Sequence, residues 1–164
     1  MVERLRSNAL TLCRIGLPKN KITYISCCSY NGFALDEEGQ AYGWGLNNYG
    51  QTGVPSDVAE GDIFIETPTI IENLKAYQIR EIKGGTHHSI ACTKDGKLMV
   101  WGRCDDSQLG IPIEYIGQDH IVFDSRNQPR NLFKPAVITD INAAFVAAGI
   151  DNSMAITEGG EVYS

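Results

Sequence analysis

Two adjacent histidines, His87 and His88, are the residues of this sequence whose types most directly suggest chemistry. Together with Cys104, Asp105 and Asp106 they could supply metal ligands, because imidazole, thiolate and carboxylate groups all bind zinc. Neighbouring side chains at the start of a strand point to opposite sides, so the two imidazoles would not converge on one ion. The sequence therefore predicts no metal site.

The sequence also lacks the motifs of covalent catalysis and of phosphate binding. No Gly-x-Ser-x-Gly segment is present to hold a serine nucleophile on a sharp turn. The pairs Gly84-Gly85 and Gly159-Gly160 precede no helix and are not followed by Lys-Ser/Thr, as a phosphate-binding loop requires. We expect a protein that is not an enzyme, needs no cofactor and works by binding a partner.

The cysteines form an odd set in which two are adjacent and none belongs to a Cys-x-x-Cys motif; they are Cys13, Cys27, Cys28, Cys92 and Cys104. This spacing suits neither ordinary zinc chelation nor an easy disulfide. Free cysteine is commonly buried as a small apolar residue in reducing compartments. The pattern indicates reduced thiols in a cytosolic or nuclear protein.

Charge and hydropathy argue against two further classes of partner. The formal net charge is -6, so the chain gains nothing overall from the phosphate attraction that drives nucleic-acid binding. The longest apolar run, residues 143–148, is far shorter than a membrane-spanning segment. We expect no direct nucleic-acid contact and no membrane association from this segment.

An internal repeat organises most of the chain. The two tryptophans, Trp44 and Trp101, are 57 residues apart, and each stands in a similar setting, residues 39–45 and 96–102. A third copy follows at an offset of 64 residues and stops at Ser164, one position before the next tryptophan would fall. Self-similarity of this kind indicates units that stack on one another.

The repeat divides the 164 residues into three units and a leading segment. Repeat 1 spans about residues 22–78, repeat 2 about 79–142 and the truncated repeat 3 about 143–164. Residues 1–21 would belong to a preceding unit or to a linker.

Each copy has the pattern of antiparallel strands joined by tight turns. Residues 33–35, 90–92 and 154–156 hold an alanine between two larger apolar side chains, and these two classes face opposite sides of a strand. A two-residue turn follows each strand, with a glycine at its second position to supply positive φ: Gly39, Gly96 and Gly160. The chain is predicted to be all-β, with room for a short helix between residues 70 and 82.

These repeats resemble those of the regulator of chromosome condensation family. The resemblance is carried by residues 82–96, which contain the Gly-x-x-His-Ser segment, and by Trp101-Gly102 and Gln108-Leu109-Gly110 after them. The family implies a β-propeller of about seven antiparallel meander blades. The chain would then be a fragment of one propeller domain, with about two and a half blades.

The resemblance covers about residues 22–164. Within this range the sequence departs from the family pattern in two loops. Residues 28–32 replace the Gly-x-x-His-Ser pattern, and residues 149–153 keep its glycine and serine but not its histidine. In a propeller, Trp44 and Trp101 recur at one register and are expected to pack between blades.

The segment from Gly110 to Arg130, with Lys134-Pro135 after it, looks like the long inter-repeat loop of fungal-type exchange factors for the small GTPase Ran. This likeness implies a nuclear guanine-nucleotide exchange factor that promotes release of GDP from Ran. It also implies association with chromatin or histones, through parts outside this chain. The family's β-wedge has no match here. The alternative is a non-catalytic propeller scaffold, for example in a ubiquitin ligase or a trafficking protein.

The family resemblance also implies which residues meet the partner. In the family, His and Asp in the loops that enter the inner strands help form the Ran-facing surface. The matching residues here are His87, His88 and Asp151, with Tyr30 and Asn31 in the diverged first loop. An alternative reading stays open, in which the histidine only bonds neighbouring backbone and fixes the turn.

Overall fold

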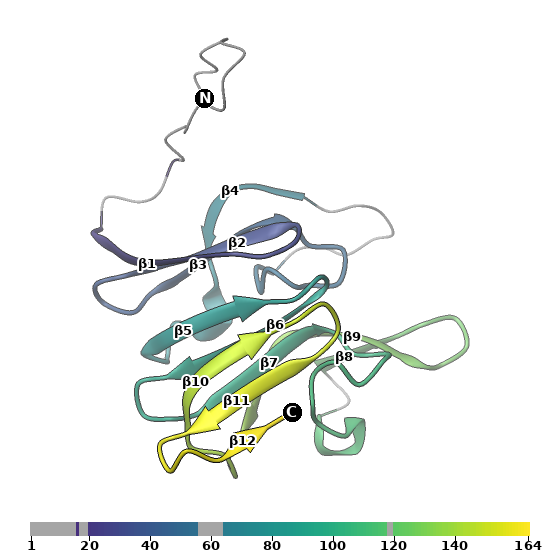
Figure 1. Cartoon of the computed structure of the whole chain (residues 1–164). Coiled ribbons are helices and arrows are strands. Elements are labelled where there is room, and N and C mark those ends of the chain that lie inside the picture. Colours follow the sequence, from purple (N-terminus) through teal and green to yellow (C-terminus); the bar gives the residue numbers. More distant parts are fainter. Residues whose placement is uncertain (1–15, 17–19, 56–63, 118–119) are drawn as a thin grey trace.

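Three antiparallel sheets make up the computed structural model, which describes residues 16, 20–55, 64–117 and 120–164 (Figure 1). The prediction of an all-β meander is confirmed, because neighbouring strands in each sheet are antiparallel and mostly consecutive in the chain. We call the sheets blades 1, 2 and 3 in chain order. The predicted leading segment lies almost entirely outside the described residues.

Blade 1 holds four strands in the order β1-β2-β3-β4. Their bounds are β1 (Ile22–Cys27), β2 (Asn31–Asp36), β3 (Ala41–Leu46) and β4 (Phe64–Ile70). Asp36 closes the turn between β2 and β3, because its Oδ1 accepts hydrogen bonds from the backbone N–H groups of Glu38 (3.0 Å) and Gln40 (2.8 Å).

Blade 2 holds five strands in the order β5-β6-β7-β9-β8. Their bounds are β5 (Ile79–Gly84), β6 (His88–Thr93), β7 (Leu98–Arg103), β8 (Ile121–Phe123) and β9 (Pro129–Ile138). Two short 3-10 helices accompany this blade. In chain order, η1 (Glu72–Leu74) precedes β5, and η2 (Ile113–Tyr115) lies between β7 and β8. The helix expected between residues 70 and 82 is therefore a single 3-10 turn.

The insertion expected to be a loop between repeats contains a β-hairpin instead. Strand β8 pairs with the start of β9, and this hairpin projects from the blade at the right of Figure 1. Asp124 closes the turn, since its Oδ1 accepts from the backbone N–H groups of Arg126 (2.8 Å) and Gln128 (2.9 Å). Asn127 adopts a φ of 58°, a value that asparagine tolerates in turns.

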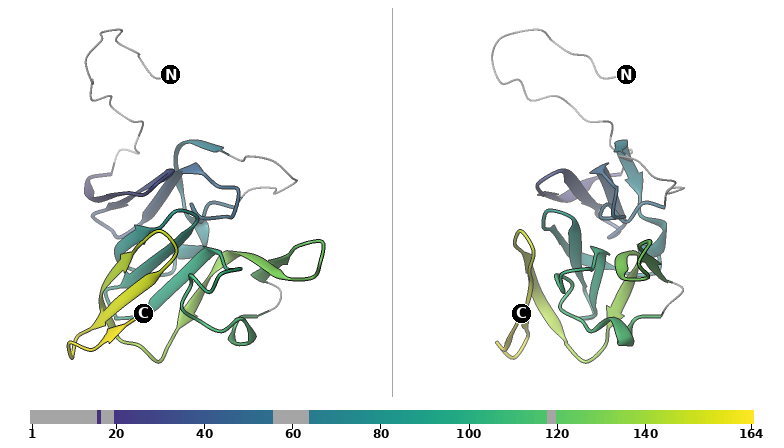
Figure 2. Two further views of the ribbon diagram at one scale, coloured as in Figure 1. Left: turned by 45° about the vertical axis from the view of Figure 1, so that its right-hand side comes forward. Right: turned by 90° about the vertical axis from the view of Figure 1, so that its right-hand side faces the viewer.

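Blade 3 contains β10 (Ala143–Ala148), β11 (Ser153–Thr157) and β12 (Val162–Tyr163), in that order. The same turn recurs in all three blades after the second strand, and its glycine has positive φ each time: Gly39 (81°), Gly96 (86°) and Gly160 (82°). Blade 2 lies between blades 1 and 3, as both views of Figure 2 show.

Alternation along the second strand of each blade builds the core between blades. Phe33 and Leu35 of blade 1 share one buried cluster with Ala91 of blade 2. Ile90 and Cys92, on the other face of the same strand, share a second cluster with Ala155 of blade 3. Large side chains therefore face the following blade and alanine faces the preceding one, so each blade shelters the apolar face of its neighbour.

A shared carbonyl ties the first two blades together at their centre. Trp101 is fully buried, its Nε1–H donates to the carbonyl oxygen of Gln51 at 3.1 Å, and its ring meets Phe33 edge-on. The Ser89 hydroxyl donates to the same oxygen at 2.8 Å. Ser153 repeats this bond to the Gln108 carbonyl, also at 2.8 Å, between blades 2 and 3.

Trp44 has the same register within its own blade but a different neighbour. It pairs with Gly32 as Trp101 pairs with Ser89, and its ring covers Gly32 so closely that a Cβ there would lie 2.5 Å from it. No described blade precedes blade 1, and Trp44 is only half-buried. No helix among the described residues is long and apolar enough to cross a membrane.

We predict that Trp101→Phe lowers the free energy of unfolding by about 2 kcal/mol, because it removes a buried hydrogen bond and leaves a void. Ser89→Ala, which removes only the second donor, should cost about 1 kcal/mol. Urea-induced unfolding measures both values. Ser125→Ala, at an exposed turn position, is the control. An unfolding midpoint for Trp101→Phe equal to that of the control would contradict the bridging role.

Candidate partner-binding surface

The loops that enter the second strand of each blade gather at one end of the molecule, on the right of Figure 1. They join β1 to β2, β5 to β6 and β10 to β11. The second and third loops touch directly, since the backbone N–H of Thr86 donates to the Ile150 carbonyl at 3.1 Å. Residues at equivalent positions of the repeat therefore lie side by side on one face.

The five predicted site residues fall into an outward and an inward set. Tyr30, His87 and Asp151 occupy the first of two adjacent loop positions; Tyr30 is 57% exposed, Asp151 is exposed and His87 is half-buried. Asn31 and His88 occupy the second position and are only 7% and 1% exposed. A partner can reach the first set directly, whereas the second set lies beneath it.

His88 crosses the interface between blades 2 and 3. Its Nε2 lies 3.3 Å from the carbonyl oxygen of Asn152, a bond that needs a proton on Nε2, and its ring packs over Gly85. Burial lowers the pKa of His88, with a smaller effect from His87, against the opposing effects of Asn152 and Asp151. This geometry fits a residue that fixes the loops.

His87 lies between two tyrosine rings. The Tyr30 ring stacks on it with centroids 6.0 Å apart, and the Tyr49 ring lies 5.0 Å away on a tilt. Burial lowers the pKa of His87 and so does the Arg103 guanidinium, while Asp151 and Asp105 oppose the shift. The imidazole is therefore mainly neutral at pH 7, and its Nδ1 is buried with no hydrogen-bond partner among the described residues.

Two arginines approach the Tyr49 ring. The Cζ atoms of Arg103 and Arg130 lie 5.6 Å and 5.1 Å from its centroid, within range of cation–π attraction. Arg103 also pairs with Asp105 (Nε to Oδ1, 2.6 Å) and with Asp106 (Nη2 to Oδ2, 2.8 Å). Arg130 is exposed and pairs with no carboxylate in the described ranges.

A glutamine turn holds Tyr49 in place and recurs in blade 2. The Oε1 of Gln51 accepts from the backbone N–H of Tyr49 at 2.9 Å, and the Oε1 of Gln108 accepts from that of Asp106, also at 2.9 Å. Tyr49 and Asp106 therefore occupy equivalent positions of the repeat. The scaffold is constant between blades, while the side chain that it presents changes.

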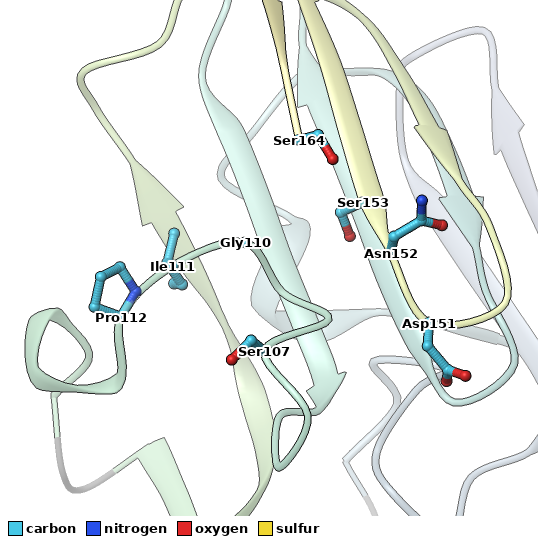
Figure 3. Close-up of a pocket in the computed structure, with 8 residues that line it drawn as sticks. All are labelled: Ser107, Gly110, Ile111, Pro112, Asp151, Asn152, Ser153 and Ser164. Carbon is cyan, nitrogen blue, oxygen red and sulfur yellow. The ribbon is translucent and has the colours of Figure 1, made fainter.

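A pocket of about 490 Å³ opens beside Asp151, as Figure 3 shows. One wall carries Asp151, Asn152 and Ser153 at the start of β11, and the facing wall runs from Ser107 to Pro112. Ser164 also lines it. The described residues contain no cluster of three or more metal-ligating side chains. This face presents aromatic, charged and hydrogen-bonding side chains.

Sequence reasoning missed three residues of this face: Tyr49, Arg103 and Arg130. Tyr49 had a usable signal, because it changes to Asp106 at the equivalent repeat position while the flanking glutamine stays constant. Arg130 had no such signal in the sequence, because the hairpin that brings it next to Tyr49 was expected to be a loop.

Comparison with known proteins identifies the repeat. The Regulator of chromosome condensation (RCC1) repeat matches residues 38–92, and a second description of the same repeat matches residues 22–51. The chain therefore contains this repeat within residues 22–92. Its three sheets are thus blades of a partial β-propeller, as predicted.

Individual relatives match over nearly the whole chain. Protein pim1 of Schizosaccharomyces pombe is 36% identical over 165 residues, which cover all of this chain and 30% of pim1. Guanine nucleotide exchange factor SRM1 of Saccharomyces cerevisiae is 31% identical over 165 residues, which cover all of this chain and 33% of SRM1. The chain therefore spans about a third of the length of these relatives.

A solved structure agrees in fold. The crystal structure of Prp20p from Saccharomyces cerevisiae, described together with its binding to Gsp1p and histones, superimposes with a TM-score of 0.78 at 31% identity. The match covers 87% of this chain and 32% of Prp20p.

We predict that His88 makes stability depend on pH. Because its pKa is lowered in the folded state, the unfolded chain takes up the proton first as pH falls through about 6.5. The stabilisation is complete above that pH and is lost below it. His88→Asn, which copies the residue at equivalent positions 31 and 152, should therefore reduce the fall in melting temperature between pH 7.5 and 5.5. An unchanged fall in the variant would refute this origin.

Proposed function

We propose that the protein to which this chain belongs is a guanine-nucleotide exchange factor for the small GTPase Ran. The observation that carries the proposal is the row of outward residues Tyr30, His87 and Asp151, which equivalent loops present on one face. The likeness to the guanine nucleotide exchange factor SRM1 supports it. Exchange is a binding function, which agrees with a face that offers stacking, charge and hydrogen bonds.

The mechanism needs no bond-making step. A protein that binds the nucleotide-free GTPase more tightly than the nucleotide-bound form weakens nucleotide affinity by the same factor, because the two binding equilibria are linked. The face must therefore hold its side chains in fixed positions, so that binding energy is not lost in ordering them. The stacking of His87 between Tyr30 and Tyr49 supplies that order.

The proposed role of each predicted site residue follows from its exposure to solvent. His87, Asp151 and Tyr30 contact the GTPase, and His87 does so mainly as a neutral ring at pH 7. His88 and Asn31 lie beneath them and set the loop positions. The Asn31 side chain has no hydrogen-bond partner within the described part of the chain, so its contribution is packing.

Location and further partners belong to the same proposal. A Ran exchange factor would act in the nucleus, and chromatin or histone contact would come from parts of the protein outside this chain. Prp20p supports this by analogy, since its crystal structure is described together with its binding to Gsp1p and histones. No direct nucleic-acid contact is assigned to the present segment, in line with its net charge of -6.

Timing the release of fluorescent GDP from Ran by the full-length protein tests the proposal. We expect His87→Ala and Asp151→Ala each to slow release about tenfold, equivalent to about 1.4 kcal/mol, with unchanged melting temperatures. Arg80→Ala is the control, because Arg80 lies at the opposite end of β5, where it bonds Glu158 and the Ala144 carbonyl. Release of GDP with Arg80→Ala should be as fast as with the unmodified protein.

Release at the spontaneous rate with the unmodified full-length protein would sink the exchange proposal. The scaffold alternative would then stand. A lower melting temperature in His87→Ala, together with slow release, would instead point to a role in fixing the loops.

A further inference from the structure

Four side chains form a continuous row of contacts across the candidate face. Successive neighbours are Tyr30 and His87 (6.0 Å between centroids), His87 and Tyr49 (5.0 Å), and Tyr49 and the Arg130 guanidinium (5.1 Å). The members come from two loops of blade 1, one loop of blade 2 and the hairpin of the insertion. We call these four residues the aromatic–arginine row.

The two arginines beside Tyr49 differ in their charge balance. The charge of Arg103 is met by Asp105 and Asp106. Arg130 is exposed at the start of β9, and the only partner of its side chain among the described residues is the Tyr49 ring. A guanidinium that contacts an aromatic ring keeps its N–H donors, and a carboxylate can accept two of them side by side.

From this geometry we infer that Arg130 is a recognition residue that pairs with a surface carboxylate of the protein partner, with Tyr49 holding the guanidinium in place. A polyanion is the less suitable occupant, because Asp105 and Asp106 beside Arg103 and Asp151 near His87 would repel a string of phosphates lying across this face. A single Asp or Glu side chain can approach Arg130 alone. The inference rests on the proposed function, since it takes the partner to be the GTPase.

An exposed charge of this kind acts mainly on the association rate and on selectivity. Opposite charges steer the encounter of two proteins, and salt screens the effect over about 10 Å. The Tyr49 ring holds the Arg130 guanidinium in place and leaves its positive charge intact. Arg130 would therefore accelerate binding of the correct partner at low salt and have less effect at high salt.

The test measures the association rate of full-length protein with nucleotide-free Ran at about 50 mM and 300 mM salt. Arg130→Ala should lower the rate about fivefold at low salt and flatten its salt dependence. Arg130→Lys should keep part of the rate, because it retains the charge but loses the two-pronged geometry. The association rate of Tyr49→Leu should be intermediate between that of the unmodified protein and that of Arg130→Ala.

Arg126 of the same hairpin supplies the matched control. Its side chain is 85% exposed and lies 3.6 Å (Nε to Oδ2) from Asp124 of the same turn. Arg126→Ala should leave the association rate unchanged. Circular dichroism and melting temperature of every variant exclude loss of folding as the cause.

The outcomes separate this inference from the proposed function. If the unmodified protein accelerates GDP release and Arg130→Ala binds as fast as Arg126→Ala, the inference is overturned and the exchange function stands. If the unmodified protein neither binds Ran nor accelerates release, both fail. If Arg130→Ala instead loses binding to a short duplex DNA while its Ran kinetics are unchanged, Arg130 serves nucleic acid and the inference is likewise overturned.

Discussion

The constraint on which the whole structure depends is that no blade can bury its own two faces. Each sheet has large apolar side chains on one side and alanine on the other, so stability requires a neighbour on each side. Hydrogen bonds to backbone carbonyl oxygens add orientation-dependent contacts to this apolar packing. Ser89 and Trp101 converge on the Gln51 oxygen, and Ser153 reaches that of Gln108, which fixes the distance and register between blades.

This stacking also creates the candidate face. Because the blades repeat the same geometry, their loops end at the same level and present equivalent residues in a row. The buried second position, filled by Asn31 and His88, supports the outward first position. Rigid support under variable side chains is what a protein needs when it acts by binding, because ordering the surface then costs little at the moment of contact.

The insertion in blade 2 modifies the repeat without disturbing it. Its hairpin adds one strand, β8, at the outer edge of the blade, and it brings Arg130 to the Tyr49 turn of blade 1. One face therefore combines loops common to the repeat with a feature specific to this blade. Repeat scaffolds commonly change specificity in this way, since loops tolerate insertion while the stacked core does not.

Local sequence determined much of this protein. The recurring glycines predicted the tight turns, the alternation around alanine predicted the paired strands, and the Gly-x-x-His-Ser segment pointed to the loops of the candidate face. These features depend on residues close together in the chain, so their patterns are visible without coordinates. The tertiary structure alone decided that Arg130 meets Tyr49, that His88 is buried beneath Asp151's loop, and that the insertion forms a hairpin. Such contacts join distant segments through packing and burial, which no local spacing encodes.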